Sequence, residues 1–341
     1  MIFGTNTRNK DEQKKLLDFN KIIAFLCFKT VNNMIFQPFL QKKKPFVKLF
    51  YFILIVVCSL FLINMIGLLL AVPFYGKSFT ESLTGVYDYS DPLVISKLKY
   101  LQIVNQLALF IVPVLIFAVF AGNSIPDYLK LNRKINMLPL IIGISIIAAC
   151  MPFINWLGEV NGNLNLPQKL GGIEEWMRTS ENEAATLTGA FLGTAHWGGF
   201  LINILMIAIL PALGEEFFFR GVLQRLFSEW FKNAHIAIIV TAFIFSAIHM
   251  QFYGFIPRFM LGLFLGYAFY WSGTLWLPII IHFLNNASTV VVAFLSARGL
   301  TTVDFETFGS SENVYVIVGS ALVVTLMMFL FYRLRKPEKT D

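Results

Sequence analysis

Ionisable residues inside long apolar stretches are the part of this sequence best suited to chemistry. Glu215 and Glu216 stand together in the stretch LPALGEEFFFRGVLQ, and Arg220 follows Glu216 by four residues. Residues four apart share one face of an α-helix, so Glu216 and Arg220 can pair, while Glu215 points about 100° away. Charged groups in such surroundings are rare and usually functional. The alternative is a helix end at the membrane surface with all three side chains solvated.

Two later apolar stretches each carry a histidine. His249 ends the stretch FIFSAIH, and His282 lies in PIIIHFLNN, four residues before Asn286. His282 and Asn286 therefore share one helix face. Taken singly, His249 would be a packing residue at a helix end, and the His282–Asn286 pair would form a helix–helix hydrogen bond.

Counting along the helices places the three groups at one depth. If the helix of Glu215 turns back at 233–234, Glu215 lies eighteen residues before that turn and His249 fifteen after it. At about 1.5 Å per residue, both are roughly 22–27 Å from the turn. His282 lies eight residues past a second turn at 273–274, or about 12 Å along its helix. We expect the three side chains to meet inside the bilayer.

The composition specifies the elements that must carry these residues. Apolar residues make up 57% of the chain and charged residues 14%, against about 25% charged in a soluble domain. A spanning helix needs about 20 apolar residues, which predicts an all-α, polytopic transmembrane helix bundle of about eight spans. The candidate spans are 48–72, 100–121, 137–158, 200–216 with an extension, 235–251, 256–272, 275–297 and 313–333.

Loop charge predicts the orientation of the bundle. The basic segments are 1–48, 122–136, 220–232 and 333–341, whereas the acidic loops are 73–98, 159–189 and 298–312. By the positive-inside rule the basic segments are cytoplasmic. We predict a multi-pass protein of the inner cell membrane with both termini in the cytoplasm. The basic clusters suit anionic lipids and not nucleic acid, because no soluble domain exists to carry a nucleic-acid site.

Some residues of the spans are typical of helix–helix contacts. Gly262 and Gly266 form a small-xxx-small pair that allows close packing, with an ordinary lipid-facing pair as the alternative. The early spans carry the amides of Asn64, Gln102, Asn105 and Gln106, which can hydrogen-bond between helices.

Three motifs, taken together, resemble a known family. The residues are similar, in order, to the pattern of the CPBP family of CAAX prenyl endopeptidases and bacteriocin-processing or immunity proteins: Glu215-Glu216-x-x-x-Arg220, Phe245-x-x-x-His249 and His282-x-x-x-Asn286. The similarity covers residues 200–295. We divide the chain into four parts: a basic, amphipathic cytoplasmic arm (1–46), accessory transmembrane helices (47–190), a catalytic helix core (191–297) that carries the resemblance, and a last transmembrane helix with a basic tail (298–341).

The resemblance implies an intramembrane endopeptidase of the glutamate type. It assigns water activation to Glu215 and His249, oxyanion stabilisation to His282 and Asn286, and support of the site to Glu216 and Arg220. Amide hydrolysis needs such a base and such donors, and an Asn amide can donate toward an oxyanion. No cofactor is favoured. Zinc held by Glu215, His249 and His282 is the alternative, although an HExxH motif is absent.

The expected partners are membrane lipids and a membrane-bound peptide or protein substrate, prenylated or bacteriocin-like. Two other functions stay open. One is a non-catalytic immunity or partner protein of the same fold. The other is a proton-coupled transporter, since buried Glu and His also form proton relays. Transporters usually show inverted repeats, and none is visible in the sequence.

Overall fold

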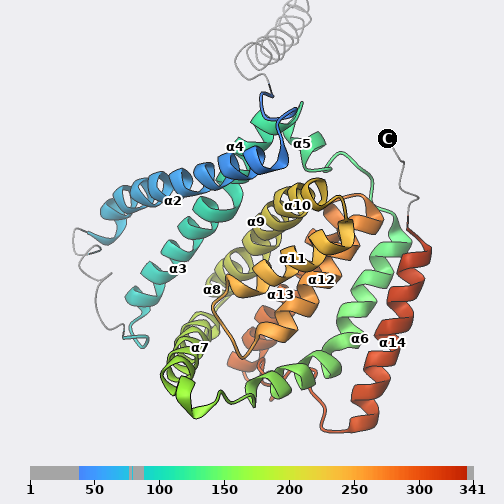
Figure 1. The fold of residues 1–341 in the computed structure, drawn as a ribbon. Helices are drawn as coiled ribbons and strands as arrows, with labels where there is room; N and C mark the ends of the chain where they lie inside the picture. Colours follow the sequence, from blue (N-terminus) through green and yellow to red (C-terminus); the bar gives the residue numbers. More distant parts are fainter. Residues whose placement is uncertain (1–37, 77–78, 80–87, 336–341) are drawn as a thin grey trace, which may run out of the picture.

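The computed structural model describes residues 38–76, 79 and 88–335, and this part of the chain is helical without strands (Figure 1). The elements in chain order are α2 (Pro45–Tyr75), α3 (Pro92–Gln106), η3 (Leu107–Ile111), α4 (Val112–Ala121), α5 (Ile125–Tyr128), α6 (Met137–Gly162), η4 (Gln168–Leu170), α7 (Gly171–Leu192), α8 (Trp197–Asn203), η5 (Ile204–Ile209), α9 (Leu210–Glu216), η6 (Phe217–Leu223), α10 (Gln224–Phe231), α11 (Ala234–Ala247), α12 (Phe255–Ser272), α13 (Trp276–Ala297) and α14 (Val314–Arg333). The predicted amphipathic cytoplasmic arm (1–46) lies, up to residue 37, outside the described residues.

The predicted polytopic membrane bundle is confirmed, with a smaller number of full-length spans. Helices occupy all eight predicted stretches. Six are long and apolar enough to cross a membrane: Pro45–Tyr75, Pro92–Ala121, Met137–Gly162, Trp197–Phe231, Trp276–Ala297 and Val314–Arg333. Helix α11 has only 14 residues, or about 21 Å against a hydrocarbon core of about 30 Å. Helix α12 has 18 residues and is less apolar, because it carries Arg258 and several aromatic polar side chains.

The fourth span is one continuous helical stretch from α8 to α10. Residues 204–209 and 217–223 adopt π-helical turns within it, and residues 107–111 form a third π turn between α3 and α4. A π turn holds one residue more than an α turn and is frequent at functional sites. The stretch ends at Lys232 in the left-handed conformation (φ 51°). Asn233 then caps α11 by accepting hydrogen bonds from the N–H groups of His235 and Ile236. The predicted turn at 233–234 is thus confirmed.

Helix α7 occupies the stretch that the sequence analysis treated as an external loop. It is 22 residues long and mostly exposed, and hydropathy missed it because charged and small polar residues alternate with apolar ones. Glu174 and Arg178 pair on it at 2.8 Å. The hydrogen bond from Arg178, followed by one from the Leu166 N–H, lowers the pKa of Glu174.

Phenylalanine rings form much of the core around the helix that carries the two glutamates. Phe110, Phe117, Phe218, Phe219 and Phe245 are all buried in one cluster. The Phe219 and Phe245 rings pack edge to face at a centroid distance of 5.1 Å. This packing fixes α11 against the helix that carries the two glutamates, because aromatic rings bury large apolar areas in specific geometries.

The segments predicted to be cytoplasmic meet at one end of the bundle (Figure 1). Lys48 at the start of α2 pairs with Glu229 of α10 at 2.7 Å. The Trp276 indole at the start of α13 donates to the Leu131 carbonyl at 2.9 Å, and Arg225 donates to the Tyr128 carbonyl. These ends therefore lie on the same side of the membrane, and which side is cytoplasmic stays a prediction.

Candidate functional site

Glu216 and Arg220 form a fully buried ion pair. Arg220 Nη1 lies 2.7 Å from Glu216 Oε1, and both side chains are 0% exposed. Arg220 Nη2 also donates to the Gly262 carbonyl of α12 at 2.8 Å. The predicted pairing is confirmed. A buried charge needs a partner and further hydrogen bonds, and this arrangement supplies both.

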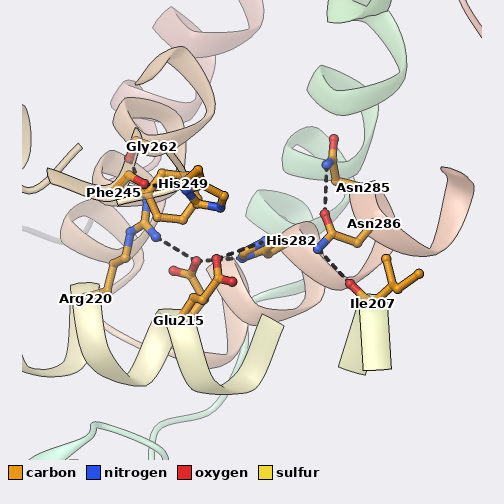
Figure 2. A network of polar contacts seen from close by, with 10 residues as sticks. Ile207, Glu215, Arg220, Phe245, His249, Gly262, His282, Asn285 and Asn286 are labelled. Carbon is orange, nitrogen blue, oxygen red and sulfur yellow. Dashed lines mark hydrogen bonds and ion pairs between the residues drawn. The ribbon is translucent and has the colours of Figure 1, made fainter. Parts of the chain in front are cut away.

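Glu216 also holds His282, a contact that the sequence analysis did not predict. His282 Nδ1 lies 2.9 Å from Glu216 Oε1, the same oxygen that Arg220 contacts. The other ring nitrogen, Nε2, lies 4.0 Å from Glu215 Oε2. An ionised carboxylate only accepts hydrogen bonds, so Nδ1 is the donor to Glu216. His282 thus contacts Glu216 through one ring nitrogen and faces Glu215 with the other, and Figure 2 shows its ring beside Glu215.

His249 lies just past the end of α11, where its ring is oriented by the backbone. His249 Nδ1 lies 2.7 Å from the Phe245 carbonyl oxygen. Because that oxygen only accepts, Nδ1 carries a proton, and Nε2 of a neutral ring is left as an acceptor. The Phe245 ring contacts both neighbours, with its centroid 4.9 Å from the Arg220 guanidinium carbon and 5.2 Å from the centroid of the His249 ring.

Asn286 is anchored to the helix that carries the glutamates. Its Nδ2 donates to the Ile207 carbonyl at 3.0 Å, and its Oδ1 accepts from Asn285 Nδ2 at 3.1 Å. Ile207 belongs to the π turn η5. An amide nitrogen carries two hydrogens, so the second N–H of Asn286 stays available for another acceptor (Figure 2).

A cavity of about 570 Å³ brings the predicted catalytic residues together. Glu215, His249, His282 and Asn286 all line it. Two elements outside the motifs complete the wall: α3 with Gln102 and Gln106, and α7 with Ala184, Leu187, Thr188 and Phe191. The sequence analysis did not place these walls at the site. The spacing of Gln102 and Gln106 could have indicated the wall formed by α3. They are four residues apart in an apolar span and therefore share one helix face.

Close packing of α11 and α12 holds the backbone around the ion pair. A Cβ atom on Gly262 would lie 3.0 Å from the Ala242 Cβ, and one on Gly266 would lie 2.8 Å from Ile238 Cγ2. The helix–helix role predicted for the two glycines is confirmed. Because Gly262 can approach α11 so closely, its carbonyl reaches Arg220.

The zinc alternative finds no preformed ligand set. Within the described residues, no group of three or more His, Cys, Asp or Glu side chains is placed to hold a metal ion. One nitrogen of His282 is already bound to Glu216, which leaves Nε2 alone for a metal. Metal dependence is therefore a question for a chelation experiment.

Comparison with known proteins covers the part of the chain that builds this site. Residues 196–288 match the family described as Type II CAAX prenyl endopeptidase Rce1-like. The uncharacterized protein YpbD of Bacillus subtilis (strain 168) is 32% identical over 89 residues, which is 25% of this chain and 42% of the relative. The membrane-embedded CAAX protease MroQ of Staphylococcus aureus (strain USA300) is 35% identical over 105 residues, or 29% of this chain and 42% of the relative. The matched region thus spans about two fifths of each relative. No solved structure matches the chain.

Proposed function

Because residues 196–288 match the family described as Type II CAAX prenyl endopeptidase Rce1-like, we propose that this protein is a membrane-embedded endopeptidase. Its substrate is a membrane-bound peptide or protein. The observation that carries the proposal is the cavity inside the bundle, where Glu215, His249, His282 and Asn286 converge. A base and an oxyanion donor in one cavity are what peptide-bond hydrolysis requires.

In the proposed mechanism, Glu215 and His249 activate one water molecule. The water oxygen attacks the carbonyl carbon of the scissile peptide bond, and its proton passes to Glu215 or to His249 Nε2. His249 is suited to this step because its Nδ1–H is held by the Phe245 carbonyl. The proton then passes to the leaving nitrogen as the C–N bond breaks, which leaves a carboxylate and an amine as products.

Oxyanion stabilisation is assigned to Asn286 and to His282 in its doubly protonated form, in which Nδ1 donates to Glu216 and Nε2 donates to the oxyanion. Both side chains are held from behind, His282 by Glu216 and Asn286 by Ile207. Donors fixed before the reaction stabilise a developing negative charge without reorganisation at the moment of bond formation. Glu216 and Arg220 support the site by fixing the ring of His282.

A second cavity favours a lipid-modified substrate. It has a volume of about 390 Å³, is lined mainly by apolar side chains of α6, α12 and α14, and shares Arg258, Leu261 and Asn285 with the catalytic cavity. An apolar chain attached to a peptide can occupy this space while the peptide lies in the catalytic cavity. We therefore propose a prenylated substrate. A bacteriocin-like peptide is the alternative.

The test is a cleavage assay in proteoliposomes. The substrates are fluorogenic peptides with a farnesylated cysteine, together with unmodified counterparts. We expect Glu215→Ala and His249→Ala to lower the cleavage rate by about 10²- to 10⁴-fold, as expected for loss of general-base catalysis. The matched controls are Glu183→Ala on the exposed face of α7 and His235→Ala, whose exposed ring contacts Tyr267. Equal cleavage by all five proteins would refute the assignment.

The same assay decides metal dependence. We expect exhaustive chelation to leave the cleavage rate unchanged, because the proposed base and donors are protein groups. Loss of activity that added zinc restores would support the zinc alternative, with Glu215, His249 and His282 as ligands. Proton flux across the proteoliposomes without any peptide cleavage would instead support the transporter alternative.

A further inference from the structure

Gln106 places a polar group in the catalytic cavity from outside the matched region. It is the last residue of α3, it is only 7% exposed, and it lines the same cavity as Glu215 and His249. Its Oε1 atom has no hydrogen-bond partner among the described residues. Buried polar atoms nearly always have a partner, so an unpaired one calls for an explanation. A ligand that binds in the cavity would be such an explanation.

The position of Gln106 relative to the glutamates is fixed by a close helix contact. The π turn η3 follows Gln106 directly and packs against Gly214, the residue before Glu215. A Cβ atom on Gly214 would lie 2.9 Å from the Phe110 Cβ and 3.0 Å from Ile111 Cγ1. Only glycine allows this approach. The end of α3 is therefore held against the helix that carries the proposed base.

Several other polar groups of the cavity already have partners. His282 is bound to Glu216, His249 Nδ1 to the Phe245 carbonyl, and Asn286 to the Ile207 carbonyl. Apart from the proposed base and the proposed oxyanion donors, Gln102 also lines the cavity, but its side chain is only half-buried, whereas that of Gln106 is buried. A peptide entering the cavity also brings backbone N–H groups, which must find acceptors away from water. The Gln106 side-chain oxygen is enclosed and has no partner among the described residues, and rotation of the amide would bring it to the cavity that Gln106 lines.

We propose that Gln106 binds the substrate by accepting a hydrogen bond from one backbone N–H beside the scissile bond. The inference rests on the proposed endopeptidase function and adds to it. The contact aligns the peptide with Glu215. It does not depend on the side chains of the substrate, since every residue except proline offers a backbone N–H. Gln106 is thus a substrate-binding residue supplied by an accessory helix.

The test pairs Gln106→Met with substrates that lack one N–H at a time. In each such substrate an ester oxygen replaces one amide nitrogen on either side of the cleaved bond. We expect Gln106→Met to lower kcat/KM for the all-amide peptide by about 10-fold, the effect of one lost hydrogen bond. One ester substrate lacks the N–H that binds Gln106. For that substrate the wild type should show the same loss of kcat/KM, and Gln106→Met should lower kcat/KM little further.

Two controls keep the result interpretable. Asn64→Leu removes an amide that donates to the Leu60 carbonyl within its own helix, and its kcat/KM should equal that of the wild type. Gln106→Leu provides a second variant if Gln106→Met unfolds at a lower temperature. An equal loss for Gln106→Met on every ester and amide substrate would overturn the inference while leaving the endopeptidase intact. Failure of the wild type to cleave any peptide would overturn the proposed function, and this inference with it.

Discussion

Glu215 and Glu216 are neighbours in the chain but lie in different surroundings. Glu216 is 0% exposed and contacts both Arg220 and His282 through one oxygen. Glu215 is 6% exposed and borders the cavity. Adjacent residues on a helix point about 100° apart, so one helical turn supplies a carboxylate for chemistry and another for structure.

Loss of the Glu216 charge should lower stability. Glu216→Gln leaves Arg220 buried without a charged partner, and breaking a buried ion pair costs about 3–5 kcal/mol. We expect a lower Tm for the protein in detergent, measured by thermal unfolding. The matched control is Glu174→Gln, which removes an ion pair of the same i,i+4 spacing on the mostly exposed α7. Exposed pairs contribute little, so its Tm should stay near that of the wild type. An equal change in both variants would contradict the structural role of Glu216.

The sequence predicted the local part of the site and not its long-range part. The Glu216–Arg220 pair follows from a spacing of four residues on one helix. The Glu216–His282 contact joins residues 66 positions apart, and nothing in the spacing shows which helix faces meet. The walls formed by α3 and α7 were missed for the same reason, because they depend on how distant helices pack.

Among the elements, α11 and α12 depart most from an ordinary spanning helix. They are short, with 14 and 18 residues, and they contact each other through Gly262 and Gly266. The backbone of α12 also binds the buried polar side chains, since the Gly262 carbonyl accepts from Arg220 and the Gly266 carbonyl from Gln224. Helix packing and the geometry of the site are thus coupled through one glycine face.

A branched side chain on the glycine face of α12 should disturb both the helix packing and the geometry of the site. Gly262→Val introduces atoms where even a Cβ would lie 3.0 Å from the Ala242 Cβ. Overpacking of this kind costs about 1–3 kcal/mol, and it moves the carbonyl that holds Arg220. We expect a lower Tm and a lower cleavage rate. Gly319→Val is the control, because nothing lies within 4 Å of a Cβ at that position of α14. Wild-type stability and activity of Gly262→Val would show that the contact is loose.

At the scale of the whole molecule, composition alone predicted the class of fold. A chain this poor in charge cannot cover a water-facing surface, and only helices satisfy their own backbone inside a bilayer. The number of full-length spans was overestimated because an apolar stretch shows hydropathy and not helix length. Helix α7 was missed because its charged residues resemble those of a loop. Loop charges also predicted which ends of the helices lie together.

The orientation can be tested by labelling single cysteines in a variant that lacks Cys27, Cys58 and Cys150. Lys134→Cys lies in the predicted cytoplasmic loop, and Thr302→Cys lies in a predicted external loop; both positions are exposed. We expect a membrane-impermeant maleimide to label Lys134→Cys only in inverted vesicles and Thr302→Cys only in right-side-out vesicles. Labelling of both from the same side would contradict the predicted topology.

The π turn at residues 204–209 has a consequence for how this chain tolerates change. Its Ile207 carbonyl anchors Asn286, so the anchor is part of the main chain. Any residue at this position keeps that carbonyl, whereas deleting one residue from the turn would rotate everything after it by about 100°, including Glu215. The information that places Asn286 is therefore carried by the number of residues in the helix and not by their identity. Such a site accepts substitutions and rejects deletions.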